Sequence, residues 1–382
     1  MKVKRVETKV DKIELKVKRV ELFHLRMPLI HYFETSFEKI HTRDCIIVKI
    51  FGNNEVGYGE VVASSTPFYN YETVETAWYV LKEFIIPIIL NHELKTVEEL
   101  AEKLAPIRGH NMAKAGVEEA LFDIFAKLQN IPISKAIGGT REQVEVGVSI
   151  GIQDSIKHLI DRIEYFLTQG YRRIKVKIKP GWDIDVVKQI RKAFESIPLM
   201  VDANCAYTLK DIDIFKCLDD FDLMMIEQPL SYDDMVDHAR LQKEIHTPIC
   251  LDESINSFAA ARTAIELGSC KIINIKAGRV GGLLNAKKIH DLCRENDIPV
   301  WCGGMLETGI GRAHNVALAS LPNFVLPGDI SGSHRYYQED IIEPPIEVQK
   351  DGTIKVPTEP GIGFSVLDER INKFCLRKES FT

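Results

Sequence analysis

Three acidic residues stand at the ends of three successive apolar segments. They are Asp202 in VDAN, Glu227 in IEQP and Asp252 in LDES, at intervals of 25 residues (227 − 202 and 252 − 227). One such acid could equally cap a helix or form a salt bridge, but three packed together repel one another unless a cation lies among them. Because an all-oxygen ligand set selects a hard ion, the pattern predicts a Mg²⁺ site, with Mn²⁺ as an alternative, supported by the neighbouring Asn204 and Glu253.

Two lysines lie at nearly the same spacing on either side of the acidic trio. Lys177 precedes Asp202 by 25 residues and Lys276 follows Asp252 by 24 (202 − 177 and 276 − 252). A nearby cation and burial lower the pKa of a lysine towards the range of a useful base. Loss of the proton α to a carboxylate adds a negative charge, giving an enediolate that a divalent ion stabilises. The residues predict proton abstraction from a small carboxylate substrate, with Lys177 and Lys276 on opposite faces; solvated surface lysines are the alternative.

The elements that must position these residues follow a regular alternation. Eight short apolar runs alternate with amphipathic segments, which is typical of an α/β fold of the (β/α)8 barrel type. Each of the five polar residues stands at the end of its run, and the carboxyl ends of barrel strands form the mouth where barrel enzymes place their chemistry. The runs are 144–152, 173–178, 199–202, 223–227, 249–252, 272–275, 300–302 and 324–326.

The first part of the chain has a different pattern, in which strands are followed by helices. Its predicted elements are a strand at 20–25, a hairpin at 45–63 and helices at 71–90, 97–104 and 112–128. We therefore expect an α+β capping domain at 1–140, of which 1–15 is an extension. We expect the barrel at 141–340, followed by a C-terminal segment at 341–382 that packs back on the capping domain.

A glycine-rich loop, GGMLETGIGRAHN, follows the seventh run at 303–315. Its Gly309-Ile310-Gly311 lacks the third glycine of a dinucleotide-binding loop, since His314 stands in that place. The backbone amides of the loop either bind a polar group or carboxylate of the substrate, or form a tight turn into a helix. The residues assigned to substrate binding are Lys175, Asn204, Ser149, Gly303, Gly304 and Met305.

Composition excludes several classes of function. The chain of 382 residues is 45% hydrophobic and 27% charged, which is ordinary for a globular protein. Its net charge of −6 argues against a nucleic-acid partner. We expect no signal peptide and no membrane span, because no apolar run is long enough. The eight cysteines form no CxxC pair and suggest no disulfide framework, so we expect a cytoplasmic protein.

Taken together and in this order, the motifs resemble the enolase superfamily. The resemblance runs from about residue 20 to 368 and rests on Lys175-x-Lys177, DAN, EQP, DES, NIKAGRVGG and WCGGMLETGIGRAHN. Within the superfamily, these motifs are similar to the muconate-lactonising subgroup. They are most similar to o-succinylbenzoate synthases that also act as N-acylamino acid (N-succinylamino acid) racemases.

The resemblance implies roles for particular residues. It implies Mg²⁺ on Asp202, Glu227 and Asp252, and acid/base roles for Lys177 and Lys276. It also implies that capping loops near Phe33 and 68–71 close over the substrate. Finally, it implies that Arg279, in the KxGRVGG pattern, holds down the pKa of Lys276.

The activity implied is a Mg²⁺-dependent dehydration in menaquinone synthesis, with N-acylamino acid racemisation as a second or even primary reaction. A cycloisomerase or dipeptide epimerase is less favoured. A mandelate-racemase site would have a histidine where Cys302 ends the seventh run, and a dipeptide epimerase would have D-x-D where Asp329 stands alone. Outside the superfamily, we weigh a Schiff-base aldolase and a binding or scaffold barrel, against which the intact acids and lysines argue. A homo-oligomer is expected.

Overall fold

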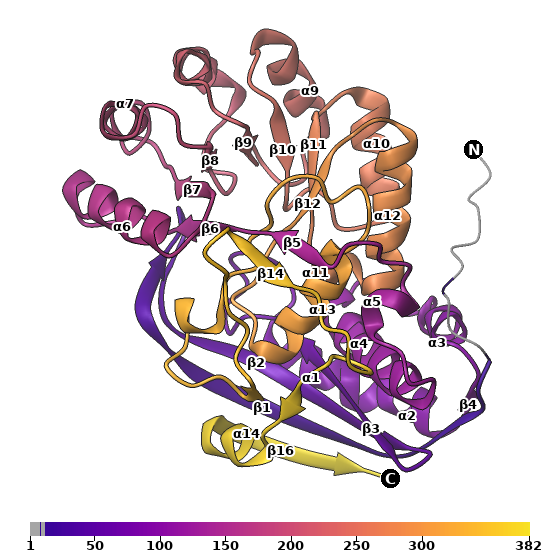
Figure 1. Ribbon diagram of the computed structural model, residues 1–382. Helices are drawn as coiled ribbons and strands as arrows, with labels where there is room; N and C mark the ends of the chain where they lie inside the picture. The colour runs from indigo at the N-terminus through magenta and orange to yellow at the C-terminus, as the bar shows by residue number, and fades with distance from the viewer. Residues whose placement is uncertain (1–7, 9–11) are drawn as a thin grey trace.

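The computed structural model describes Thr8 and residues 12–382, so most of the predicted extension at 1–15 lies outside the described residues. The chain forms a capping region, with long antiparallel strands and a group of helices, and a ring of alternating strands and helices beside it (Figure 1). None of the helices in the described ranges has the length and hydropathy needed to cross a membrane.

The capping region is built on one antiparallel sheet. Its strands are ordered β16-β1-β2-β3, where β16 is Cys375–Phe381 from the end of the described chain, and β4 also pairs with β1. The predicted hairpin is confirmed: β2 turns into β3 at Asn53 and Asn54, whose φ angles of 48° and 64° suit a two-residue turn. The elements are β1 (Leu15–Glu34), β2 (Lys39–Gly52), β3 (Glu55–Val61), α1 (Val74–Val80), the π-helix η1 (Leu81–Ile85), α2 (Ile86–Leu90), β4 (Glu93–Leu94), α3 (Val97–Leu104), α4 (Asn111–Leu128) and α5 (Ile133–Ala136).

Helix α1 begins later than predicted, and helix α4 packs unusually close to a strand. The helix predicted at 71–90 begins later, at Val74, because the side chain of Thr73 accepts a hydrogen bond from the Thr76 backbone N–H and caps the helix there. Helix α4 lies directly against β3. A Cβ atom added to Gly59 would lie 2.0 Å from the carbonyl oxygen of Gly116, so only glycine permits this approach of strand and helix.

The predicted barrel is confirmed. Seven parallel strands are ordered β12-β11-β10-β9-β8-β7-β6. Its elements are β5 (Gln143–Glu145), β6 (Gly147–Ile150), α6 (Ile156–Thr168), β7 (Arg173–Lys177), α7 (Ile184–Ala193), β8 (Leu199–Asp202), η2 (Leu209–Asp211), α8 (Ile212–Leu218), η3 (Asp219–Phe221), β9 (Ile226–Glu227), α9 (Met235–Glu244), β10 (Ile249–Leu251), α10 (Phe258–Leu267), β11 (Ile272–Ile275), α11 (Ala277–Val280), α12 (Leu283–Glu295), β12 (Val300–Cys302), α13 (Gly309–Ala319) and η4 (Ser333–Arg335).

The eighth predicted run is not a regular strand. It closes the ring through single parallel bridges, from Phe324 to Val300 on one side and from Gly328 to Val146 on the other. Pro327 lies between the two bridges and has no N–H to donate to a ladder. The segment therefore joins both neighbours without forming a strand of its own.

The C-terminal segment returns to the capping sheet. β16 pairs antiparallel with β1, from Val20↔Phe381 to Leu25↔Cys375, and α14 packs against β1. β14 pairs with β5, which precedes the first barrel strand. The elements of this segment are β13 (Ile342–Glu343), β14 (Thr353–Lys355), β15 (Ser365–Val366), α14 (Asp368–Phe374) and β16 (Cys375–Phe381).

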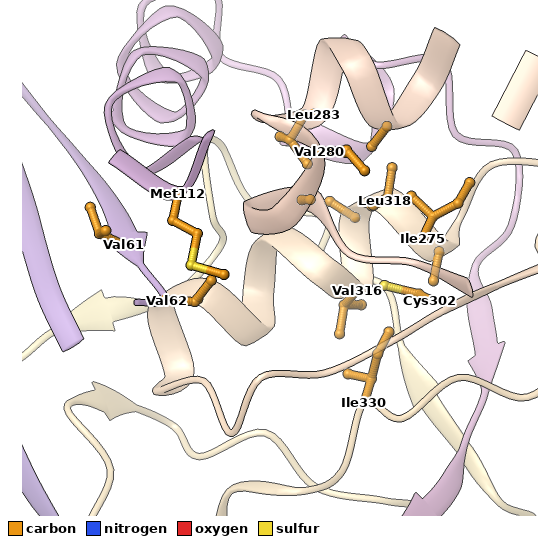
Figure 2. Packing of buried hydrophobic residues seen from close by; sticks show 14 of the residues in the cluster. Val61, Val62, Met112, Ile275, Val280, Leu283, Cys302, Val316, Leu318 and Ile330 are labelled. Atoms are coloured by element: carbon orange, nitrogen blue, oxygen red, sulfur yellow. The ribbon is translucent and has the colours of Figure 1, made fainter. Parts of the chain in front are cut away.

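An apolar core is continuous across the junction of cap and barrel. Figure 2 shows Val62 of the cap and Met112 of α4 close together, opposite the chain that carries Val280 and Leu283 of the barrel. All four side chains are buried. At Gly278, in α11, an added Cβ would lie 2.3 Å from Val62 Cγ2, so α11 approaches the cap as closely as a glycine allows. The cap is therefore packed on the barrel and not merely tethered to it.

We expect Gly59→Ala to lower the free energy of unfolding by about 1–3 kcal/mol, because the new methyl group would meet the backbone of α4, which cannot rotate away. Gly332→Ala is the matched control. Gly332 has a φ of −61°, and its nearest atom to an added Cβ is at 3.3 Å. Urea unfolding of both variants measures the difference. Equal losses of stability would contradict the tight strand–helix contact.

Candidate active site

The barrel strands bring the predicted acids and lysines to one end of the ring. Lys177 ends β7 and is the register partner of Asp202, which ends β8 and is in turn the partner of Glu227 on β9. Asp252 follows β10 directly, and Lys276 follows β11. All five side chains are buried, although each carries an ionisable group. Burial of so many charges requires that they neutralise one another.

Each carboxylate of the trio is bound by cationic or amide groups. Asp202 Oδ2 accepts from Lys177 Nζ at 2.6 Å, and Lys175 Nζ lies 2.9 Å from Glu227 Oε2 and 3.3 Å from Asp202 Oδ2. Asp252 accepts from Lys276 Nζ at 2.9 Å and pairs with the Arg279 guanidinium. The trio thus forms one row of acids with Lys177 at one end and Lys276 at the other, which we call the acidic row.

The Asn274 side chain ties two members of the acidic row together. Its Nδ2 donates to Glu227 Oε1 at 2.7 Å and to Asp252 Oδ1 at 3.0 Å. Its Oδ1 is buried and has no hydrogen-bond partner among the described residues, and the same is true of Glu253 Oε2. Glu253 accepts at Oε1 from Asn204 Nδ2 at 2.9 Å, and Asn204 Oδ1 accepts from Lys177 at 2.7 Å. Asn204 therefore links the lysine to a further acid.

Burial and the neighbouring charges shift the pKa values of these acids in different directions. Burial and the nearby Asp202 carboxylate raise the pKa of Glu227 to about 8. Burial also acts to raise the pKa of Asp252, but Arg279 and Lys276 outweigh it and hold this pKa below its usual range. The pKa of Glu253 is raised to about 7 by burial and by Asp252. Without a further cation, the row does not keep all its carboxylates ionised at neutral pH.

The donor set of the acidic row suits a divalent cation. Its carboxylates are buried side by side, two further buried oxygens, Asn274 Oδ1 and Glu253 Oε2, have no partner among the described residues, and burial and the charge of Asp202 raise the pKa of Glu227. In the described part of the chain, however, no group of three or more His, Cys, Asp or Glu side chains is already arranged around one point. The carboxylate oxygens are turned to their lysine and arginine partners instead.

The pKa of Lys276 differs from the sequence-based expectation. Burial acts to lower this pKa, but the Asp252 carboxylate outweighs burial and holds the pKa well above its ordinary value. Arg279 does act in the predicted, lowering direction. It is a smaller influence than Asp252, because Lys276 Nζ lies only 2.9 Å from that carboxylate. In this state, Lys276 is a protonated cation.

A cavity of about 90 Å³ is lined by the lysines at both ends of the row, but none of the three acids is in its lining. The barrel residues in its lining include Lys177 and Lys276, and the cap contributes Phe33 and Tyr69. Of the residues assigned to substrate binding, those that line the cavity are Ser149, Lys175, Asn204, Gly304 and Met305. Gly303 is not in the lining; an added Cβ there would lie 2.7 Å from Lys276 Cε, so this glycine makes room for the lysine.

Two models of known families match the chain. One described as "Mandelate racemase / muconate lactonizing enzyme, N-terminal domain" matches residues 17–138, and one described as "Enolase C-terminal domain-like" matches residues 158–370. The chain belongs to the enolase superfamily. The sequence-based resemblance is thereby confirmed at the level of the family.

Relatives within the enolase superfamily are similar over most of their length. The chain is 54% identical to an o-succinylbenzoate synthase of Geobacillus kaustophilus over 90% of this chain and 91% of the relative. It is 49% identical to an N-succinylamino acid racemase of Thermus thermophilus, over 87% and 89%. A crystal structure of an enolase-superfamily member from Listeria innocua has a TM-score of 0.92 and 43% identity, covering 96% of this chain and 99% of that chain.

In this enolase-superfamily chain, helix α13 begins at Gly309, within the segment 303–315. The backbone N–H groups of Thr308 and Gly311 donate to Glu60 of the cap, each at 3.1 Å from Glu60 Oε2, and Gly309 N–H donates to Asp340 Oδ1 at 2.7 Å. These amides are therefore engaged by protein carboxylates at the start of α13. The interpretation of the loop as a turn into a helix is correct, and these amides are not free for a substrate carboxylate.

The structure gives roles to residues for which the sequence analysis had none. Asn274 precedes Lys276 by two residues. Because side chains alternate along a strand, its side chain is expected on the same side as that of Lys276, so the sequence could have identified it. Asp329 pairs with Lys175 and with Arg173, each at 2.6 Å. Tyr69 lies inside the capping loop expected at 68–71, whereas its neighbours Phe68 and Tyr71 are 62% and 57% exposed and do not line the cavity.

Tyr69 links the cap to the charged groups of the barrel. Its hydroxyl accepts from Lys276 Nζ at 3.0 Å and from Arg279 Nη1 at 3.1 Å, and donates to Asp252 Oδ2 at 3.3 Å. The Lys276 ammonium also lies 4.6 Å from the centre of the Tyr69 ring.

We expect Tyr69→Phe to lower the free energy of unfolding by about 1–2 kcal/mol, because two buried cations lose a shared hydrogen-bond acceptor. Tyr71→Phe, which removes the same hydroxyl group from an exposed ring, should change it by less than about 0.5 kcal/mol. Urea unfolding at one pH compares the two variants with the unaltered protein. A Tyr69→Phe effect no larger than that of Tyr71→Phe would show that this link contributes nothing to docking of the cap.

Proposed function

We propose that the protein is an o-succinylbenzoate synthase, a lyase that dehydrates a hydroxy acid in menaquinone synthesis after loss of the proton α to its carboxylate. The observation that carries the proposal is the contact of a buried lysine with the acid at each end of the row, Lys177 with Asp202 and Lys276 with Asp252. The relative that is 54% identical over nine-tenths of the chain supports the choice of reaction.

We propose that Asp202, Glu227 and Asp252 hold Mg²⁺, with Mn²⁺ as the alternative. Their buried oxygen donors support a hard divalent ion, as does the pKa of Glu227, which burial and the charge of Asp202 raise. When bound, this ion would supply the positive charge that stabilises the second negative charge arising on the substrate carboxylate. Asn204 and Glu253 would hold the acids and Lys177 in position through their hydrogen bonds, without binding the ion themselves.

The lysines have different tasks in the dehydration. Neutral Lys177 takes the α-proton, the C–O bond to the substrate hydroxyl breaks, and Lys177 returns the proton to the departing hydroxyl, which leaves as water. Lys276 stays protonated and stabilises the developing negative charge from the opposite face. Its place in the lining of the cavity supports this role. Lys175, Ser149, Gly304 and Met305 would contact the substrate.

N-succinylamino acid racemisation is the second candidate, and the site favours it for one reason. A protonated Lys276 is also a proton donor, and it lines the cavity together with Lys177. One lysine can therefore remove the α-proton while the other supplies a proton to the opposite face. The racemase of Thermus thermophilus at 49% identity supports this second activity.

The domain limits remain part of the proposal. We propose that the cap comprises 1–140, that the barrel comprises 141–340, and that 341–382 completes the cap. The pairing of β16 with β1 supports the last of these assignments.

The proposed function is tested by assaying the purified protein for both reactions with Mg²⁺ and after treatment with a chelator. We expect formation of o-succinylbenzoate that stops without the metal and returns when Mg²⁺ is added back. Racemisation without dehydration would make the second candidate the true activity. Turnover that is unaffected by the chelator would exclude a catalytic metal, and no turnover of either substrate would favour a binding barrel.

We expect the affinity for Mg²⁺ to rise with pH up to about 8. In the metal-free protein, the pKa of Glu227 is raised to about 8, so below this pH the carboxyl group holds a proton that the ion must displace. Binding then releases a proton, and the affinity should increase by up to about ten-fold per pH unit before it levels off. Isothermal titration calorimetry one unit below and one unit above that pKa measures the change. Glu227→Gln should bind more weakly and lose most of this dependence. A pH-independent affinity of the unaltered protein would show that the ion displaces no proton from Glu227, and an unchanged affinity in Glu227→Gln would show that Glu227 is not a ligand.

We expect Lys177→Ala to lower dehydration by ~10²–10⁴-fold or more, because the base is lost. Lys276→Ala should abolish racemisation, yet one enantiomer of an N-succinylamino acid should still exchange its α-proton through Lys177. Proton NMR of each pure enantiomer in D₂O with Mg²⁺ reads this exchange directly. Lys287→Ala, a change to a partly exposed lysine of α12 that lies outside the cavity lining, serves as control. Equal residual exchange from both enantiomers in Lys276→Ala would rule out one lysine on each face.

A further inference from the structure

A second, larger cleft lies outside the candidate active site. It has a volume of about 430 Å³ and is bounded by the end of β1, by α6 and by the segment from Gly332 to Val348. It shares no lining residue with the cavity of the candidate active site. The dehydration and racemisation use none of its residues, so its chemistry needs a separate explanation.

The lining of this cleft is rich in positive charge. It contains Arg162 of α6 and Arg335 of η4, together with His31 and His334, and its only acidic residue is Glu347. Among the described residues, neither arginine has a carboxylate within ion-pair distance, and Glu347 pairs with neither. Arg335 Nε is buried and without a hydrogen-bond partner in the same part of the chain. Two guanidinium groups therefore lie in one cleft with their charges unbalanced.

Both guanidinium groups contact the same aromatic ring. The central carbon of each lies 4.8 Å from the centre of the Phe166 ring. This contact orients both planar groups and places two like charges around one ring. Burial and then the charge of Arg335 lower the pKa of Arg162, and burial followed by the charges of both arginines lowers the pKa of His31. A bound anion would relieve this repulsion.

A hydroxyl group and apolar surface complete the cleft. The buried Tyr171 hydroxyl accepts a hydrogen bond from Gly332 N–H at 3.1 Å, which leaves its own hydrogen available to a ligand. Ile30 and Tyr165 are 44% and 51% exposed at the same cleft. The space is larger than a single ion needs, and part of its surface is apolar.

We propose that this cleft binds a small organic anion whose phosphate or carboxylate group is held between the guanidinium groups of Arg162 and Arg335. Guanidinium groups pair with both kinds of oxyanion in the same forked geometry, so the shared chemistry defines the ligand class. Tyr171 adds a neutral donor, and Ile30 and Tyr165 contact the apolar part of the ligand.

Hydrogen bonds to backbone oxygens connect the cleft to the candidate active site. Arg335 Nη2 donates to the backbone oxygen of Ser149 at 2.9 Å, and Ile30 N–H donates to the backbone oxygen of Tyr336 at 2.9 Å. Ser149 and Tyr336 line the catalytic cavity. The ligand would therefore lie beside residues that are hydrogen-bonded to Ser149 and Tyr336, which line the cavity of the candidate active site.

The proposal is tested by calorimetric titration of the full chain with inorganic phosphate and, separately, with succinate. We compare the unaltered protein with Arg162→Gln and with Lys157→Gln, which removes the same charge from an exposed position of α6 outside the cleft. Arg162→Gln should weaken binding by about ten-fold or more, because a charge-assisted contact is lost, while Lys157→Gln should leave it unchanged. Arg335→Gln should weaken binding similarly and gives a second measurement if Arg162→Gln fails to fold, which circular dichroism reveals.

The two anions distinguish the sources of the ligand. Loss of phosphate binding in Arg162→Gln identifies a phosphate-bearing ligand, and loss of succinate binding identifies a carboxylate-bearing one. Absence of saturable binding of both anions by the unaltered protein would overturn the proposal. It would equally be overturned by binding that both glutamine variants of the arginines retain in full, since the anion would then occupy another site.

Discussion

Neutralisation of buried charge in the mouth of the barrel is the constraint on which the site depends. The carboxylates of Asp202, Glu227 and Asp252 lie out of water, where an unpaired charge is costly. Lysine and arginine side chains from neighbouring strands meet them, although burial and the charge of Asp202 still raise the pKa of Glu227. The site is therefore held together by the same opposite charges that its chemistry requires. Binding of a divalent ion would replace some of the contacts that the carboxylates make with lysine and arginine.

The cap takes part in this balance directly. Tyr69 reaches from the cap to Lys276 and Arg279, and Glu60 occupies the N-terminus of α13 through Thr308 and Gly311. The apolar junction around Val62 and Gly278 fixes the distance over which these polar contacts form. Cap and barrel thus form one site, although their residues are far apart in sequence.

Much of the fold and the candidate site could be predicted because they repeat along the chain. A period of about 25 residues places Lys177, Asp202, Glu227 and Asp252 at successive strand ends, so one sequence pattern determines several positions. Contacts between distant segments have no such pattern. Tyr69 meets Asp252 across 183 residues and Thr308 meets Glu60 across 248, and both contacts depend on how the cap docks. The apolar residues of the eighth barrel run predict a strand, but Pro327 cannot donate to the ladder and the segment forms only single bridges.

The pairing of β1 with β16 has a consequence for synthesis of the chain. β1 begins at Leu15, near the start, whereas its neighbour on one side, β16, ends at Phe381. While the ribosome is still producing the barrel, the backbone groups of β1 on that side have no strand to pair with, and an unpaired strand edge can recruit other chains. The sheet that contains β1 is therefore completed only after the whole barrel has been synthesised, and the nascent chain remains open to misassembly until β16 has been added.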